Sequence, residues 1–219
     1  MVNDIPKWAR GYLRPDRVRL IEEAVAEAES KTSGEIVPMI VRRSSTVGHV
    51  PVIVLCVLVI LFLLFDGPTH QARWLGAHWA WYLADVFVVL AISSFLSRWS
   101  FVQRILTSRD DQELQVNLRA EVEFYESDTA KTRGATGVLL FVSLMERRAV
   151  VLADKAIAEK LPTETWSTVC SLLVDGIKQK HIGLAFRDAI LHCGKMLAPL
   201  FPIRPDDVDE LKNQLILKE

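Results

Sequence analysis

The chain has 219 residues, of which 50% are hydrophobic and 24% charged, and its formal net charge is −1. This length predicts one domain, or one domain with an accessory element, and the near-zero charge gives no electrostatic reason to expect nucleic acid as a partner. The three cysteines form no CxxC pair and no even set, which argues against a disulfide framework. We expect Cys56, Cys170 and Cys193 to be reduced and buried.

The chain opens with a predicted helix and strand. Residues 16–33 place Val18, Ile21, Val25 and Ala28 at helical spacing, and Gly34 stands where a helix commonly stops. Residues 35–43 then have the composition of a strand. Because Pro38 has no amide hydrogen to donate, it predicts either an edge strand or a bulge.

Two apolar runs follow, at residues 50–65 and 79–96, and the loop between them, 66–78, contains the strong breaker Asp66-Gly67-Pro68. The first run has no polar side chain and, with residues 47–49, approaches the ~20 residues needed to span a hydrocarbon core. We predict a transmembrane helical hairpin, inserted between a strand and the next helix. The alternative is that both runs are core helices of a larger soluble fold. The rest of the sequence, however, offers no matching amphipathic surface that could bury them. Asp85 is either interfacial or a functional intramembrane carboxylate.

The distribution of arginines predicts the membrane orientation. Residues 1–13 contain no apolar segment typical of a signal peptide. The loop between the runs contains Arg73 as its one arginine or lysine, whereas arginines flank the runs on their other sides. The positive-inside rule therefore places both termini and the α/β domain in the cytoplasm. The arginines that flank the two runs are Arg42, Arg43, Arg98, Arg104 and Arg109.

The second half of the chain alternates helices and strands. Ser108 is a predicted N-cap, with Asp111 at the capping-box position, for a helix that ends near Asp128. Residues 138–143 and 149–153 predict a β-hairpin, and helices are expected from about Thr163 and about Gly183. The tail, 206–219, is either packed on the domain or loose. The 108–128 helix places four apolar side chains on one stripe: Leu114, Leu118, Val122 and Tyr125.

Several segments together resemble the TPM domain family: Thr32-Ser33-Gly34-Glu35-Ile36-Val37, Thr136-Gly137-Val138-Leu139-Leu140-Phe141-Val142-Ser143, Glu146-Arg147 and Val151-Leu152-Ala153-Asp154. The likeness covers roughly residues 16–215 and is greatest to bacterial inner-membrane members that insert hydrophobic segments after the first strand. It implies an α/β/α sandwich with a small central mixed sheet. It does not imply one activity, since a weak acid phosphatase activity is attributed to a plant member while others are accessory factors. Lys155-Ala156 stands where the resemblance implies a glycine-containing turn.

The expected organisation therefore has four segments. Residues 14–46 form the first helix and strand of the TPM-like domain, 47–97 the two-helix transmembrane hairpin, 98–205 the remainder of the domain, and 206–219 a C-terminal tail.

A candidate site follows from the predicted topology. The long connection between the first two strands predicts that they are parallel, and the hairpin makes the third strand antiparallel. One end of the sheet then gathers oxygen-bearing side chains that suit Ca²⁺ or Mg²⁺, with Arg133 placed for a phosphate. The alternative is that these groups only satisfy turn amides. The ligand candidates are Thr32, Ser33, Glu35, Thr136 and Asp154, beside Thr132.

The other end of the sheet gathers basic residues at the point where the hairpin leaves. Arg42, Arg43, Arg147 and Arg148 either face anionic headgroups or act only as topology determinants. Ser143 and Glu146 are expected at the same end.

No motif of covalent or metal-dependent catalysis is present: the chain contains no GxSxG, P-loop or HExxH sequence. His70 and His78 have no third ligand at metal-binding spacing. We therefore expect a non-enzymatic accessory or assembly factor for a membrane protein complex, with the lipid bilayer and a membrane protein as partners. The alternatives are a metal-dependent phosphatase-like hydrolase and a domain that senses a divalent cation or anionic lipid.

Overall fold

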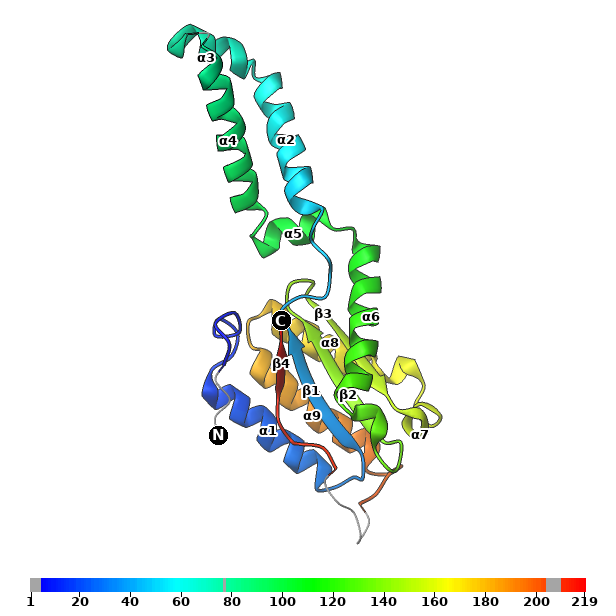
Figure 1. The fold of residues 1–219 in the computed structure, drawn as a ribbon. Coiled ribbons are helices and arrows are strands. Elements are labelled where there is room, and N and C mark those ends of the chain that lie inside the picture. The colour runs from blue at the N-terminus through cyan, green and yellow to red at the C-terminus, as the bar shows by residue number, and fades with distance from the viewer. Residues whose placement is uncertain (1–4, 77, 204–209) are drawn as a thin grey trace. The chain divides into compact units, whose positions relative to one another are not determined.

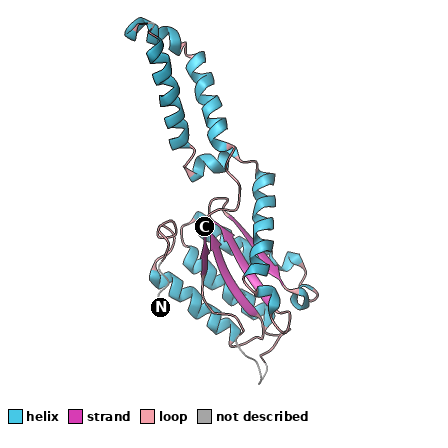
Figure 2. Ribbon diagram, viewed as in Figure 1, coloured by secondary structure: helices cyan, strands magenta, loops and turns pink. Residues whose placement is uncertain are grey.

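The computed structural model describes residues 5–76, 78–203 and 210–219 (Figures 1 and 2). The chain divides into two compact units. One comprises Met1–Ser44 with Glu113–Glu219, and the other comprises Ser45–Gln112. The first unit contains the β-sheet, and we call it the sheet unit; the second is helical, and we call it the helical unit.

The sheet has four strands in the order β3-β2-β1-β4. Strand β1 (Glu35–Val41) is parallel to β2 (Gly137–Ser143) and to β4 (Ile216–Lys218), while β3 (Arg148–Ala153) is antiparallel to β2. The parallel first pair and the antiparallel hairpin are as the sequence predicts. Strand β4 lies in the predicted tail, whose residues 206–209 fall outside the described part of the chain.

Helices cover both faces of the sheet, which makes this unit an α/β fold with a small mixed sheet. On one face, Met39 and Phe141 pack against helix α6 (Arg109–Glu126). On the other, Ile40 and Leu140 belong to a larger core shared with α1 (Pro15–Glu29), α8 (Ser167–Lys178) and α9 (Ile182–Leu197). The alternation of side chains along each strand sends successive residues to opposite faces. The short elements are η1 (Thr129–Lys131), α7 (Lys155–Ala158) and η2 (Thr163–Trp166).

Pro38 lies in β1 at a position where its lack of an amide hydrogen costs no hydrogen bond to a neighbouring strand. Alternate residues of a strand direct their amides to the same side. The Ile36 amide donates to Glu29 Oε1 (2.8 Å) and the Arg42 amide to the Lys218 carbonyl (3.1 Å), so the Pro38 nitrogen faces the β4 side. Strand β4 pairs only from Met39 onward. Strand β1 is thus an edge at Pro38 and an interior strand beyond it, which refines the predicted edge position.

Helix α6 has an apolar side chain stripe on each of two opposite faces. Ser108 caps the helix as predicted, its Oγ accepting the Asp111 amide at 3.1 Å. Val116, Ala120 and Phe124 are buried against the sheet. The stripe singled out by the sequence faces away from this core. Its members are 49–68% exposed: Leu114, Leu118, Val122 and Tyr125. We call these four residues the α6 stripe.

The helical unit contains α2 (Val50–Leu64), α3 (Gly67–Leu75), α4 (Trp79–Leu96) and α5 (Ser100–Leu106). Within it, α2 and α4 pack together, and Ser93 Oγ donates to the Pro51 carbonyl at 2.7 Å. Among the described helices, α4 alone is long and apolar enough to cross a membrane by itself. Helix α2 has 15 residues, about 22 Å at 1.5 Å per residue, and passes the same test only together with α3, from which a 65° bend separates it. The predicted loop after Asp66 is therefore largely helical.

The cysteines differ from the expectation of three buried thiols. Cys56 is exposed, Cys170 is partly buried and Cys193 is buried. Desolvation raises the pKa of the Cys193 thiol and, to a smaller extent, that of Cys170. Because the thiolate is the reactive form, a raised pKa makes the two cysteines of the sheet unit poor nucleophiles. The apolar run around Cys56 is outward-facing, which is why its side chain is exposed.

Candidate functional site

Residues of the predicted strand-end site lie close together at one end of the sheet. The Glu35 amide donates to the Thr136 carbonyl at 3.1 Å, and the Asp154 amide donates to the Gly137 carbonyl at 2.8 Å. Thr136 Oγ1 donates to the Ser33 carbonyl at 2.9 Å. The starts of β1 and β2 and the end of β3 therefore meet, as the parallel and antiparallel pairings require.

Within this cluster, most of the hydroxyl groups are engaged by backbone atoms. Thr32 is 2% exposed, and its Oγ1 donates to the Phe201 carbonyl (2.6 Å) while accepting the Gly34 amide (3.2 Å). Ser33 donates its amide to the same Phe201 carbonyl at 3.0 Å. Thr132 Oγ1 accepts the Thr136 amide at 3.0 Å. These contacts are those expected of groups that stabilise turns.

The Glu35 carboxylate holds the C-terminal segment in place. Glu35 is 8% exposed, and its two oxygens lie 3.2 Å from the Glu210 amide and 3.4 Å from the Leu211 amide. Glu210 in turn accepts the Arg133 amide, at 3.0 Å from its Oε2. An acidic side chain of the chain itself thus lies beside Arg133, where the sequence predicts a phosphate. The sequence reasoning missed this segment. Its one signal was the short apolar run Leu215-Ile216-Leu217.

Asp154 is the member of the cluster that retains a spare oxygen. Its Oδ1 caps α7 by accepting the Lys155 amide at 2.7 Å. Its Oδ2 is buried and has no hydrogen-bond partner among the described residues. A cation could use this oxygen, but no group of three or more His, Cys, Asp or Glu suited to a metal occurs in the described ranges. Any cation here would therefore depend on hydroxyl, carbonyl or water oxygens for its remaining ligands.

The opposite end of the sheet contains a buried carboxylate between serines. Glu146 is 5% exposed; its Oε1 accepts the Ser44 amide at 3.0 Å and its Oε2 accepts a short hydrogen bond from Ser143 Oγ. Of the basic residues predicted here, Arg42 pairs with Glu219 (3.5 Å) and Arg148 with Glu113 (2.9 Å). Arg43 and Arg147 are exposed.

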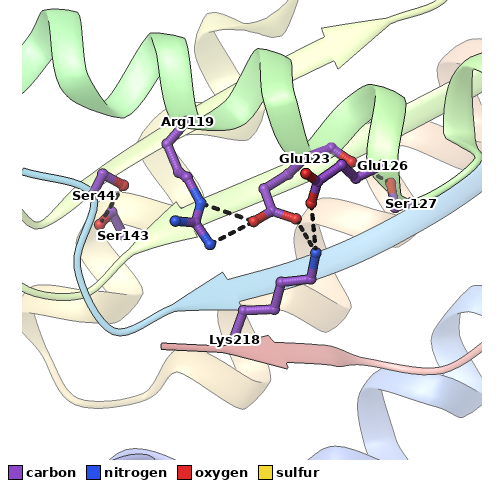
Figure 3. A network of polar contacts seen from close by, with 7 residues as sticks. All are labelled: Ser44, Arg119, Glu123, Glu126, Ser127, Ser143 and Lys218. Atoms are coloured by element: carbon purple, nitrogen blue, oxygen red, sulfur yellow. Dashed lines mark hydrogen bonds and ion pairs between the residues drawn. The ribbon is translucent and has the colours of Figure 1, made fainter.

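A second buried carboxylate, Glu123, was not singled out by the sequence. Its side chain is 1% exposed and lies between Arg119 of the same helix (2.7 Å) and Lys218 of β4, with which it makes a short contact (Figure 3). Lys218 also lies 3.4 Å from Glu126. The hydrogen bond to Glu123 raises the pKa of Lys218 above its ordinary value, against the effect of desolvation. This network attaches the C-terminal strand to α6. The i, i+4 spacing of Arg119 and Glu123 is a sequence signal for an ion pair on one helix. The contact with Lys218 joins residues far apart in the chain and has no such signal.

Comparison with known proteins gives a likeness of fold. No family model matches the chain, and no curated protein matches it. Among solved structures, the chain is similar to the NMR structure of the BA42 protein from the psychrophilic bacterium Bizionia argentinensis. The TM-score is 0.59 at 20% identity, over 94% of this chain and 95% of that one. This likeness is consistent with a TPM-like α/β fold.

Proposed function

We propose that the chain is a TPM-like, membrane-anchored and non-enzymatic accessory factor, whose sheet unit docks a protein partner within a membrane complex. The sequence segments that resemble the TPM domain and the fold likeness to BA42 support the first part of this proposal. The exposed apolar surface of the helical unit supports the anchor. The α6 stripe supports the docking role and is the observation that carries it.

The anchor follows from the side chains that the helical unit leaves uncovered. Phe65, Phe87 and Leu64 are 71–77% exposed, and Ser93 is the buried residue of α4. Soluble monomers rarely expose contiguous apolar surface of this extent, whereas hydrocarbon chains would cover it. In this proposal α4 is one membrane span and the bent α2–α3 pair is the other.

The proposed orientation places the sheet unit and both termini in the cytoplasm, because the arginines gather on the chain segments outside the hairpin. In that arrangement exposed Arg43 and Arg147 approach anionic headgroups. The test is thiol accessibility in a cysteine-free background, with His70→Cys in α3 compared with Lys178→Cys in the sheet unit. Labelling of His70→Cys from outside intact cells, with Lys178→Cys protected, is the expected result. The reverse labelling would overturn the orientation.

The α6 stripe is suited to a helix or other apolar segment of a partner protein. Its residues recur at intervals of four, four and three, which places them on one face of the helix. The opposite face of α6 is already committed to the core of the sheet unit. Because these four side chains are already about half covered, burying the rest of each would supply roughly half of the ~1.5–3 kcal/mol that full burial gives, before the costs of association.

The charges beside the stripe indicate the chemistry of the partner. Exposed Asp110 and Glu121 are each three or four residues from members of the stripe, so they lie next to it on the helix surface. Arg119 is likewise three residues from Val122, but it pairs with Glu123 at 2.7 Å, which leaves the acidic groups as the unneutralised flank. Acidic flanks disfavour both anionic lipid and a second α6 stripe. They favour a protein segment with apolar anchors and lysine or arginine at its edges.

Site-specific photo-crosslinking tests this docking role. A photoreactive residue at Leu118 of the full-length protein in native membranes should give one specific protein adduct, whose crosslinked peptide is apolar with basic neighbours. The same residue at Glu23, an exposed position on α1, is the matched control and should not give it. Val122→Ser should remove the adduct. Crosslinking to lipid alone, or equal adducts from both positions, would overturn the proposal.

A second candidate function is a divalent-cation site, and the buried, unpartnered Asp154 Oδ2 is the observation that favours it. In this alternative Glu35 and Asp154 contribute carboxylates and Arg133 contacts a phosphate, as in a phosphatase-like hydrolase or a cation sensor. Calorimetric titration of the detergent-solubilised protein with Ca²⁺ and Mg²⁺, beside Asp154→Ala, tests it. Saturable binding lost in the variant would support the site. Absence of heat in both proteins would leave Asp154 as a helix cap.

A further inference from the structure

The sheet unit has a cavity of about 390 Å³ at a place remote in sequence from every predicted site residue. It lies between the segment that leads into α1 and the turn from α8 to α9. Five of its lining residues carry basic side chains, and no acidic side chain is among the described residues that line it. These basic residues are Arg10, Arg14, Arg17, Lys180 and His181.

The local structure gathers these residues although they come from two distant segments. Helices α1 and α9 run parallel, since Gly183 lies against Arg17 and Gly194 against Ala28: a Cβ at either glycine would fall 2.7–2.8 Å from the Cβ opposite. The close approach at Gly183 brings the backbone of α9 against the side chain of Arg17. A side chain at position 183 would push Arg17 away. The two helices consequently begin at the same end, beside the cavity.

The helix starts add to the positive potential of the side chains. Arg14 is the N-cap residue of α1 and His181 that of α9, and neither side chain makes a capping hydrogen bond. Each helix N-terminus carries about half a positive charge, and two of them side by side repel one another unless an anion lies nearby. The first turn of α9 contains no acidic residue. Asp16, in the first turn of α1, lies 3.5 Å from Arg17 Nε, but both side chains are exposed, so this pair is weak.

From this arrangement we infer that the cavity binds an anionic ligand through a phosphate group, with Arg14, Arg17 and Lys180 as its principal contacts. Planar guanidinium groups bind phosphate oxygens in pairs, which an ammonium group alone does not. Arg10, whose Nε donates to the Ile5 carbonyl at 3.0 Å, also lines the cavity.

The volume and remaining walls indicate that the ligand is more than an inorganic ion. The cavity is within the size range of small-molecule sites. Partly buried Tyr12 and Leu184 line it beside the basic residues. They offer apolar surface to the organic part of a phosphate ester. A soluble phosphorylated compound and the headgroup of a phospholipid share this chemistry.

Titration of the full-length, detergent-solubilised protein with inorganic pyrophosphate tests the inference. Saturable binding is expected, and it should weaken about tenfold or more in Arg14→Gln and in Arg17→Gln, because each removes charge-assisted hydrogen bonds. Arg19→Gln is the matched control, since Arg19 lies on the same helix but pairs with Glu23 at 2.8 Å. Lys180→Gln, in an exposed turn, gives a second variant that does not alter α1. Thermal melts without ligand identify any variant that fails to fold.

Nanodiscs distinguish the two sources of the phosphate. If the ligand is a lipid headgroup, pyrophosphate should bind more weakly in discs of equal parts phosphatidylglycerol and phosphatidylcholine than in phosphatidylcholine alone. Arg17→Gln should abolish that difference. If the ligand is soluble, the two disc compositions should give the same affinity. Absence of saturable binding, or equal binding by the wild type, Arg17→Gln and Arg19→Gln, would overturn the inference.

Discussion

The two units of this chain use apolar side chains in opposite ways. In the sheet unit Phe141 and Phe186 are completely buried, whereas in the helical unit Phe87 is 71% and Leu64 74% exposed. Burying such a side chain stabilises a protein by about 1.5–3 kcal/mol. The sheet unit gains this stabilisation by burying its apolar side chains in its own core. In the helical unit the corresponding side chains stay exposed, so they contribute little of it within the chain. A high content of hydrophobic residues can therefore reflect either a buried core or an exposed apolar surface. Only the exposure of the individual side chains distinguishes the two.

The largest expected effect distinguishes the two units by their response to the same substitution. Phe186→Ala should destabilise the sheet unit by about 3–5 kcal/mol, because it leaves a cavity that close-packed neighbours fill only in part. The free energy of unfolding, from denaturant titration followed by circular dichroism, measures this loss. Phe87→Ala is the matched control in the helical unit and should cost far less in detergent. Equal losses would mean that Phe87 is packed in a protein core.

A charged substitution in the middle of α4 tests what covers the helical unit. Val88 is 55% exposed, so Val88→Asp should be tolerated if the helix faces water. If α4 spans a bilayer, an aspartate near its centre costs about 2.5–3.5 kcal/mol of insertion free energy. We expect Val88→Asp to increase the fraction of protein released from membranes by alkaline carbonate, while Val88→Leu leaves it unchanged. Identical extraction of all three proteins would contradict a membrane span at α4.

The sequence predicted the parts of the fold that depend on local pattern. The first helix, the first three strands, their directions and the Ser108 cap all follow from spacing, turn residues and the handedness of crossovers. The resulting cluster at one end of the sheet was also predictable, because strand directions determine which residues meet there. What the pattern could not give was the C-terminal strand. This strand has three residues, and its partners in β1 lie 177 positions earlier in the chain (216 − 39), so it leaves almost no local signal.

The faces of α6 show a second limit of pattern alone. Both apolar stripes of this helix have helical spacing, so periodicity alone does not tell which of them faces the core. The choice between them depends on Glu123, which is buried beside Phe124 only because Arg119 and Lys218 neutralise it. A charged residue such as Glu123 is ordinarily found on the solvent side of a helix, so the pattern alone disfavours burying this face. The structure assigns the buried face to Val116, Ala120 and Phe124 and leaves the α6 stripe exposed.

The attachment of the C-terminal strand should depend on Lys218. Lys218→Met keeps the aliphatic stem but leaves Glu123 with Arg119 alone, at a cost of about 1 kcal/mol, because the lysine itself is 35% exposed. Since the folded pKa of Lys218 is raised, its contribution is fully present below the ordinary lysine pKa of about 10.4 and is lost as the pH rises through the folded value. Denaturant midpoints of the two proteins, measured with increasing pH, should therefore converge in strongly alkaline solution.

Lys178→Met supplies the comparison for that measurement. Lys178 pairs with Asp175 at 3.2 Å, but both side chains are about 60% exposed, and such pairs contribute little. A loss as large as that of Lys218→Met would show that a general charge effect, and not the buried Glu123, is responsible.

The smallest expected effect on stability is at the α6 stripe, where the loss of binding should be large. Leu118 is 49% exposed, so Leu118→Ser should change the free energy of unfolding by no more than about 0.5 kcal/mol. Val116→Ser, two residues earlier but 1% exposed, should instead destabilise the protein by several times that amount. Unfolding and crosslinking measured on the same two variants separate the faces. Leu118→Ser should keep the fold and lose the partner, because a side chain that the protein does not bury for its own stability is available for another molecule. A stability loss at Leu118 comparable to that at Val116 would mean that the stripe is already buried within the chain.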